Sequence, residues 1–139
     1  MDRNITPIDT RHEAIKVLRD ELSLHGFTRD SEPREVSQSI LVSAAGRMVR
    51  RLVNLGDISF ANEFLIESGC EQTHERWLMA CAEDMVCAPS PRPSEIACQR
   101  AGWYAGGFVQ EALDMLDSAS EIERDRHVDE QIKQAKETA

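Results

Sequence analysis

Residues 34–55 carry the pattern that most constrains how this chain can fold. Apolar and small side chains recur there at helical spacing and cover about half of the circumference of a helix, which is wider than the ~100° stripe of an ordinary surface helix. They are Leu41, Ala44, Ala45, Met48, Val49, Leu52, Val53 and Leu55. A helix of this kind must be covered on two sides, so the sequence predicts a central helix with other elements packed around it.

Other segments show helix boundaries together with helical spacing. Thr10 and Glu13 fit a capping box ahead of an apolar set, and Gly26 follows that set where a C-cap belongs. No segment alternates apolar and polar residues as a half-buried strand would. We therefore predict an all-α fold of about five to six helices. In addition to the central helix and the helix between Thr10 and Gly26, we predict helices over residues 57–68, 73–87, 94–106 and 108–119.

The domain organisation follows from length and from breaks in the pattern. A chain of 139 residues is long enough for one hydrophobic core. A Pro-rich stretch at 88–93 interrupts the helices as an irregular linker, because it offers no helical option. After residue 120 the apolar pattern decays among charged residues. We predict a single helical domain over 1–120 and a charged C-terminal helix or tail over 121–139.

Two segments, 56–65 and 107–116, share an internal pattern in which Gly is followed five residues later by Ala and four further on by Leu. The glycine permits a sharp turn between antiparallel helices, and the alanine lets the two backbones approach. This pattern resembles the second helix of tetratricopeptide (TPR) repeats, although the copies lie 51 residues apart and the usual period is about 34. The resemblance implies an irregular, TPR-like stack of antiparallel helix hairpins, whose concave face would bind a peptide or helix.

Composition and motifs argue against several functions. The formal charge of -9 opposes binding to nucleic acid, which requires an excess of Lys and Arg. No apolar run approaches the ~20 residues of a membrane-spanning helix. The chain contains no GxSxG, HExxH, P-loop or GxGxxG motif. We therefore expect no enzymatic activity, no catalytic residue, no cofactor, no nucleic-acid partner and no membrane partner.

The cysteines show neither metal-site nor disulfide spacing. Cys70, His74 and Cys81 would share one face if a single helix ran through them, but Gly69 marks a break and a fourth ligand is not evident. The start of the chain carries charges and a proline where a signal peptide needs an apolar core. We expect a cytoplasmic protein with reduced core thiols and no metal site.

One positive cluster stands out in this acidic chain. It consists of Arg47, Arg50 and Arg51. Basic side chains are favoured in the last turns of a helix by its dipole, which is one interpretation of the cluster. Docking of an acidic partner is the other, and the sequence leaves both open.

Three segments, 12–26, 48–57 and 76–83, resemble the YscG/HrpG-type needle (pilus) subunit chaperones of bacterial type III secretion in order and spacing. The resemblance implies a TPR-like, non-enzymatic virulence protein that pairs with a small helical co-chaperone. Together the two would hold a polymerisation-prone needle or pilus subunit soluble before export. In the plant-pathogen branch of the family it also implies an effect on secretion-gene regulation, with a regulatory protein as a further partner.

The resemblance also implies a binding groove, because a concave apolar surface can shield the amphipathic helix of such a subunit. Carried onto this chain, the partner-binding groove would use Ser43, Gly46, Arg50, Val53, Arg76, Met79, Glu83 and Val86. The alternative function is an acidic helical regulatory inhibitor that binds a transcription regulator or another DNA-binding protein. Such a decoy needs carboxylates along one face, whereas the acidic residues of this chain are spread opposite the apolar stripes.

Overall fold

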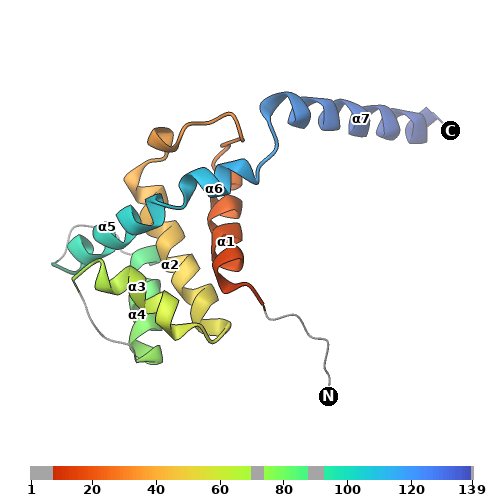
Figure 1. Ribbon diagram of the computed structural model, residues 1–139. Helices are drawn as coiled ribbons and strands as arrows, with labels where there is room; N and C mark the ends of the chain where they lie inside the picture. Colours follow the sequence, from red (N-terminus) through yellow and green to blue (C-terminus); the bar gives the residue numbers. More distant parts are fainter. Residues whose placement is uncertain (1–7, 70–73, 88–92, 139) are drawn as a thin grey trace, which may run out of the picture.

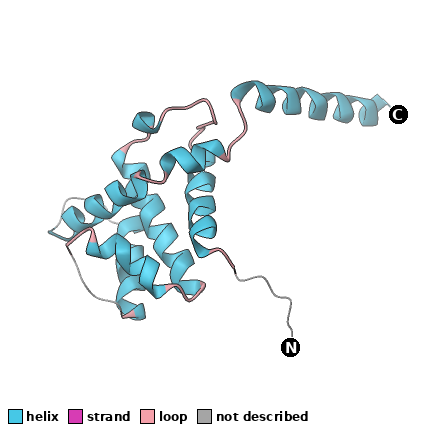
Figure 2. Cartoon of the chain, viewed as in Figure 1, coloured by secondary structure: helices cyan, strands magenta, loops and turns pink. Residues whose placement is uncertain are grey.

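The computed structural model describes residues 8–69, 74–87 and 93–138 (Figure 1). Throughout these residues the regular structure is helical and no strand is present, as Figure 2 shows. The prediction of an all-α fold of about five to six helices is therefore confirmed. In chain order the elements are α1 (Thr10–Leu24), the short 3-10 helix η1 (Pro33–Glu35), α2 (Gln38–Asn54), α3 (Ile58–Ile66), α4 (Glu75–Cys87), α5 (Pro93–Gly106), α6 (Val109–Asp114) and α7 (Ala119–Thr138).

Helix α2 lies at the centre of the molecule. It packs most extensively against α4, α5 and α1, and seven of its residues are buried. Both flanks of its wide apolar face are thus covered, as the sequence pattern of residues 34–55 predicts. The helix begins later than that pattern suggests, because Val36 has an extended backbone (ψ 120°) that separates it from η1.

The helices surround α2. In Figure 1, α2 runs antiparallel to α1 on one side and to α4 on the other, while α3 crosses α4. α5 packs against α2, and α6 returns to pack against α1. In a regular repeat array each hairpin contacts only its neighbours. Here elements far apart in the sequence close around one helix, so the arrangement differs from a regular open row of hairpins.

Aromatic side chains join α3 to α5 and to the start of α6. Phe64 packs edge-on against Tyr104 with ring centroids 4.9 Å apart, and Phe108 lies 5.5 Å from Tyr104 and 6.0 Å from Phe60. Edge-to-face aromatic pairs contribute beyond the area that they bury. This cluster fixes the position of α3 and hence of the surface that α3 shares with α4.

The helix ends follow local sequence signals, with one difference. Gly26 and Gly56 end α1 and α2 with φ of 86° and 85°, a conformation that glycine adopts readily. The N-cap of α1 is Asp9, whose side chain accepts a hydrogen bond from the backbone N–H of His12. The predicted capping box at Thr10 is therefore wrong, because Thr10 is already helical and its hydroxyl donates to Asp57 Oδ2 at 2.5 Å.

Helix α7 extends away from the rest of the molecule (Figure 1). It is held at its first turn, where the backbone N–H of Ala119 donates to Asp30 and Arg29 pairs with Glu121 at 2.9 Å. Further along, Val128 and Ile132 are each 49% exposed. The predicted C-terminal segment 121–139 thus falls within this helix up to residue 138, and residue 139 lies outside the described part.

Candidate functional site

The eight predicted groove residues come from α2 and α4, which run side by side along what we call the α2–α4 seam. The closest approach is at Gly46, where an added Cβ would lie 2.9 Å from Val86 Cγ2 and 3.0 Å from Met85 Cβ. The same Cβ would lie 2.6 Å from the backbone carbonyl oxygen of Ala82, so the two helices pack closely at the middle of the seam. Hollows lie at either end of it.

Two of the eight residues are part of the packed interior. Gly46 is buried against α4, and Val53 is 4% exposed and belongs to the hydrophobic core. The structure therefore places neither of them on an open surface. The other six remain at least partly accessible and are distributed among three hollows.

The largest of these hollows, which we call the α3–α4 hollow, has a volume of about 860 Å³. It brings together three of the predicted residues from one face of α4. Apolar side chains and charges of both signs meet in it, so it offers contacts to an amphipathic segment. Its lining residues are Ile58, His74, Glu75, Arg76, Met79, Ala80 and Glu83.

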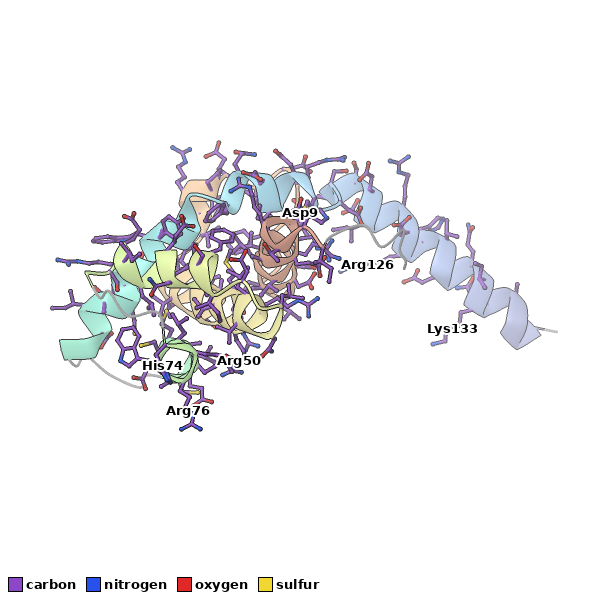
Figure 3. The ribbon with its side chains drawn as sticks, turned by 60° about the horizontal axis from the view of Figure 1, so that its bottom comes forward. Asp9, Arg50, His74, Arg76, Arg126 and Lys133 are labelled. Atoms are coloured by element: carbon purple, nitrogen blue, oxygen red, sulfur yellow. The ribbon has the colours of Figure 1, made fainter. Side chains whose placement is uncertain are left out.

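His74 and Arg76 are placed by the start of α4 (Figure 3). The Nδ1 atom of His74 accepts a hydrogen bond from the backbone N–H of Arg76 at 3.3 Å, so the imidazole satisfies one of the free donors of the first helical turn. Met79 is partly buried against the core while its side chain also lines the hollow. Because methionine is unbranched and polarisable, it adapts to different apolar partners.

The opposite end of the seam has a smaller hollow of about 390 Å³ between α2, α4 and α5. Ser43 and Val86 both line it, together with Met85 and the buried Cys98. The remaining predicted residue, Arg50, lines a third hollow between α1 and α2. The predicted groove residues therefore do not form one continuous trough.

Two ionisable groups outside these hollows, Glu13 and Tyr104, have shifted pKa values. A hydrogen bond from Arg51, followed by one from Lys16, lowers the pKa of Glu13. Burial, followed by the charge of Glu63, raises the pKa of Tyr104. Both groups lie outside the α3–α4 hollow.

The structure also bears on the expectations about the cysteines, metal binding and membrane-spanning helices. Cys98 is buried, Cys81 is half-buried and Cys87 is exposed, whereas Cys70 lies outside the described residues. Within the described ranges, no group of three His, Cys, Asp or Glu side chains could hold a metal ion. None of the helices described is both long enough and apolar enough to span a bilayer.

Sequence reasoning missed part of the α3–α4 hollow. Ile58 comes from the first turn of α3, and His74 precedes α4, so neither shares a helix face with the predicted residues. It also gave no role to Trp103, which is 65% exposed on α5. For Ile58, the sequence offered one signal: it directly follows Asp57, the N-cap of α3.

Comparisons of the chain with protein-family models, with curated proteins and with solved structures find no match. Its function is therefore inferred from its own residues and their geometry.

Proposed function

We propose that this chain is a chaperone that binds an amphipathic helix of a partner polypeptide and has no enzymatic activity. In the form that the sequence resemblance implies, it acts in the cytoplasm with a small helical co-chaperone and holds a type III secretion needle or pilus subunit soluble before export. The observation that supports binding is the α3–α4 hollow, in which Ile58 and Met79 lie beside exposed charges.

The charges along α4 can set the direction of a bound helix. Arg76 and Glu83 are seven residues apart on α4, which corresponds to two turns and a rise of about 10.5 Å. A partner helix lying along this strip would place an acidic side chain near Arg76 and a basic one near Glu83. Its apolar residue between them would contact Met79. Complementary charges of this kind add more to specificity and orientation than to affinity.

Co-expression tests the proposal. The chain would be produced with the co-chaperone and the needle or pilus subunit from its own gene cluster, and the product analysed by size-exclusion chromatography with light scattering. We expect a soluble complex of defined stoichiometry, because the subunit would otherwise polymerise. Separate elution with continued polymerisation of the subunit would overturn the proposal.

A substitution in the hollow tests which surface is used. Ala80 is exposed on α4 and lines the hollow, so Ala80→Arg inserts a long side chain there without disturbing the core. The matched control is Gln110→Arg, which adds the same charge at an exposed position of α6. We expect Ala80→Arg alone to abolish the complex. Equal retention of the subunit by both variants would show that it binds elsewhere.

A further inference from the structure

Three arginines lie within two turns of α2, and two of them pair with carboxylates among the described residues. Arg47 Nε lies 2.8 Å from Glu21 Oε1, and Arg51 Nη2 lies 2.7 Å from Glu13 Oε1. Both carboxylates belong to α1. Arg50, between them in the sequence, forms no ion pair or hydrogen bond within the described part of the chain.

The guanidinium of Arg50 is partly enclosed. Its Nε atom is buried and has no hydrogen-bond partner, and the residue as a whole is half-buried. An enclosed donor without a partner is uncommon in folded proteins, in which buried polar groups are nearly always paired. The two Nη atoms are not among the buried side-chain atoms that lack a partner, and neither is hydrogen-bonded to the described residues.

Arg50 lines a hollow of about 330 Å³ between α1 and α2, which we call the arginine hollow. It is lined by Arg47, Arg50 and Arg51 together with the apolar side chains of Val17 and Leu24. Leu24 is 83% exposed, so an apolar surface stands directly beside the cationic one.

The acidic residues that line this hollow are already engaged. Glu21 is bound by Arg47, and its other oxygen lies 3.3 Å from His25 Nε2. Asp20 pairs with Arg19 at 2.8 Å. Neither carboxylate is hydrogen-bonded to Arg50, so no acidic residue of the described lining pairs with its positive charge.

We propose that the arginine hollow binds a carboxylate side chain of a partner polypeptide across the two Nη atoms of Arg50. An apolar residue next to that carboxylate would contact Leu24 and Val17. This inference rests on the proposed function, because it takes the partner to be the polypeptide bound at the α3–α4 hollow.

The two hollows are close enough in the fold to serve one partner. Asn54, at the end of α2, lines the arginine hollow, and Ile58, four residues later, lines the α3–α4 hollow. In Figure 3, Arg50 lies at the same end of the molecule as His74 and Arg76. A partner segment that contacts the start of α4 would therefore lie at the same end of the molecule as Arg50.

The ligand is a carboxylate for two reasons. A guanidinium binds carboxylate or phosphate in a bidentate manner, but a chain with a net charge of -9 repels a polyphosphate strand. In addition, the arginines on either side of Arg50 are both bound to carboxylates. The partner chemistry is thus an acidic residue next to an apolar one, as on the edge of an amphipathic helix.

Nuclear magnetic resonance of the full chain tests the site without the partner. The side-chain Nε–Hε signals of arginine would be followed while hexaglutamate, hexaglutamine or inorganic phosphate is added. We expect hexaglutamate to shift the Arg50 signal saturably and hexaglutamine to leave it unchanged. Arg34, whose side chain is 85% exposed, is the internal reference. Equal shifts at Arg34 and Arg50, or tighter binding of phosphate than of hexaglutamate, would overturn the proposal.

Variants at Arg50 complete the test. Arg50→Lys keeps the charge and most of the apolar stem but loses the paired donors, so we expect hexaglutamate to bind roughly tenfold more weakly with little change in the unfolding midpoint. Arg50→Gln should abolish binding, and Arg34→Gln should have no effect. Unchanged hexaglutamate affinity in both Arg50 variants would contradict the assignment.

The outcomes separate this inference from the proposed function. A saturable shift at Arg50 with no capture of the needle or pilus subunit would leave the carboxylate site standing and remove the proposed partner. Capture of the subunit that is unaffected by Arg50→Lys, with no shift on adding hexaglutamate, would remove the carboxylate site and leave the proposed function standing.

Discussion

Gly46 of α2 faces the backbone of Ala82 of α4 so closely that a Cβ added to Gly46 would lie 2.6 Å from the Ala82 carbonyl oxygen. Real Cβ atoms do not approach a carbonyl oxygen to that distance. Because Gly46 has no side chain, α2 and α4 can pack closely along the seam. Most residues of the α3–α4 hollow belong to α4, so the hollow depends on the position of that helix.

Substitution of Gly46 by alanine should destabilise the protein. The new methyl group meets backbone, which cannot rotate away, so we expect a loss of about 1–3 kcal/mol in the free energy of unfolding. Gly106→Ala is the matched control, because its Cβ would lie 3.4 Å from Leu41 Cδ1, an ordinary contact, and alanine favours the helix by up to about 1 kcal/mol. Urea unfolding of both variants measures the difference. Equal stabilities would show that the seam can open without cost.

Val53→Asp should disrupt folding. Val53 is 4% exposed and lies in the core, so the substitution buries a carboxylate without a partner and costs about 3–5 kcal/mol. Val128→Asp is the control, because Val128 is half-exposed on α7 and surface substitutions usually change stability by less than about 0.5 kcal/mol. Far-UV circular dichroism during thermal unfolding distinguishes the two. Retained helicity and midpoint in Val53→Asp would instead place Val53 on the surface.

The ion pair of Glu13 with Arg51 should make stability depend on pH. Hydrogen bonds from Arg51 and then Lys16 lower the pKa of Glu13 below its ordinary 4.5 in the folded chain. A lowered folded-state pKa means that the contribution is complete above the unfolded value and is lost as the pH falls through the folded one. In Arg51→Gln, acidification from neutral pH to about pH 3.5 should therefore reduce stability less than in the wild type.

The measurement is the urea midpoint at each pH, and Arg34→Gln serves as the control because Arg34 is exposed and pairs only with Glu32 among the described residues. An acid-induced decrease of the same size in Arg51→Gln and in the wild type would show that Glu13 titrates alike in the folded and unfolded chains.

Removal of residues 125–139 should leave the stability of the remaining chain unchanged. Helix α7 projects from the body (Figure 1), and its attachment at Ala119 and Glu121 precedes the cut. We expect the urea midpoint to stay constant, because the removed part of α7 projects from the body. The helical signal per chain should decrease, because the deletion removes residues that are helical in the structure. A lower midpoint would mean that the distal part of α7 supports the body.

The candidate site could be predicted only in part. The family resemblance implies that Arg76, Met79 and Glu83 line one groove, and helical periodicity is consistent with this because positions 76, 79 and 83 lie on one side of α4. Ile58 and His74 complete the same hollow from outside that helix, and their arrival there depends on how α3 crosses α4. Periodicity within one segment carries no information about such a crossing.

The same limit separates Arg50 from Val53. The family resemblance implies that both line the partner-binding groove, yet Val53 is buried and Arg50 lines a hollow. A helical pattern identifies the apolar side of a segment, but how much of each flank is covered depends on the distance to the next helix. At the seam that distance is set by Gly46, which brings α4 close.

The sequence by itself determined the helical class, most helix ends and the central role of α2. These follow from short-range effects: Gly26 and Gly56 supply positive φ, Asp57 caps α3, and a half-apolar helix requires cover on both flanks. Only the tertiary structure decided which elements provide that cover, where the hollows lie and which arginine of α2 pairs with no carboxylate of the described residues. Those outcomes depend on contacts between residues far apart in the chain, whose geometry no local pattern specifies.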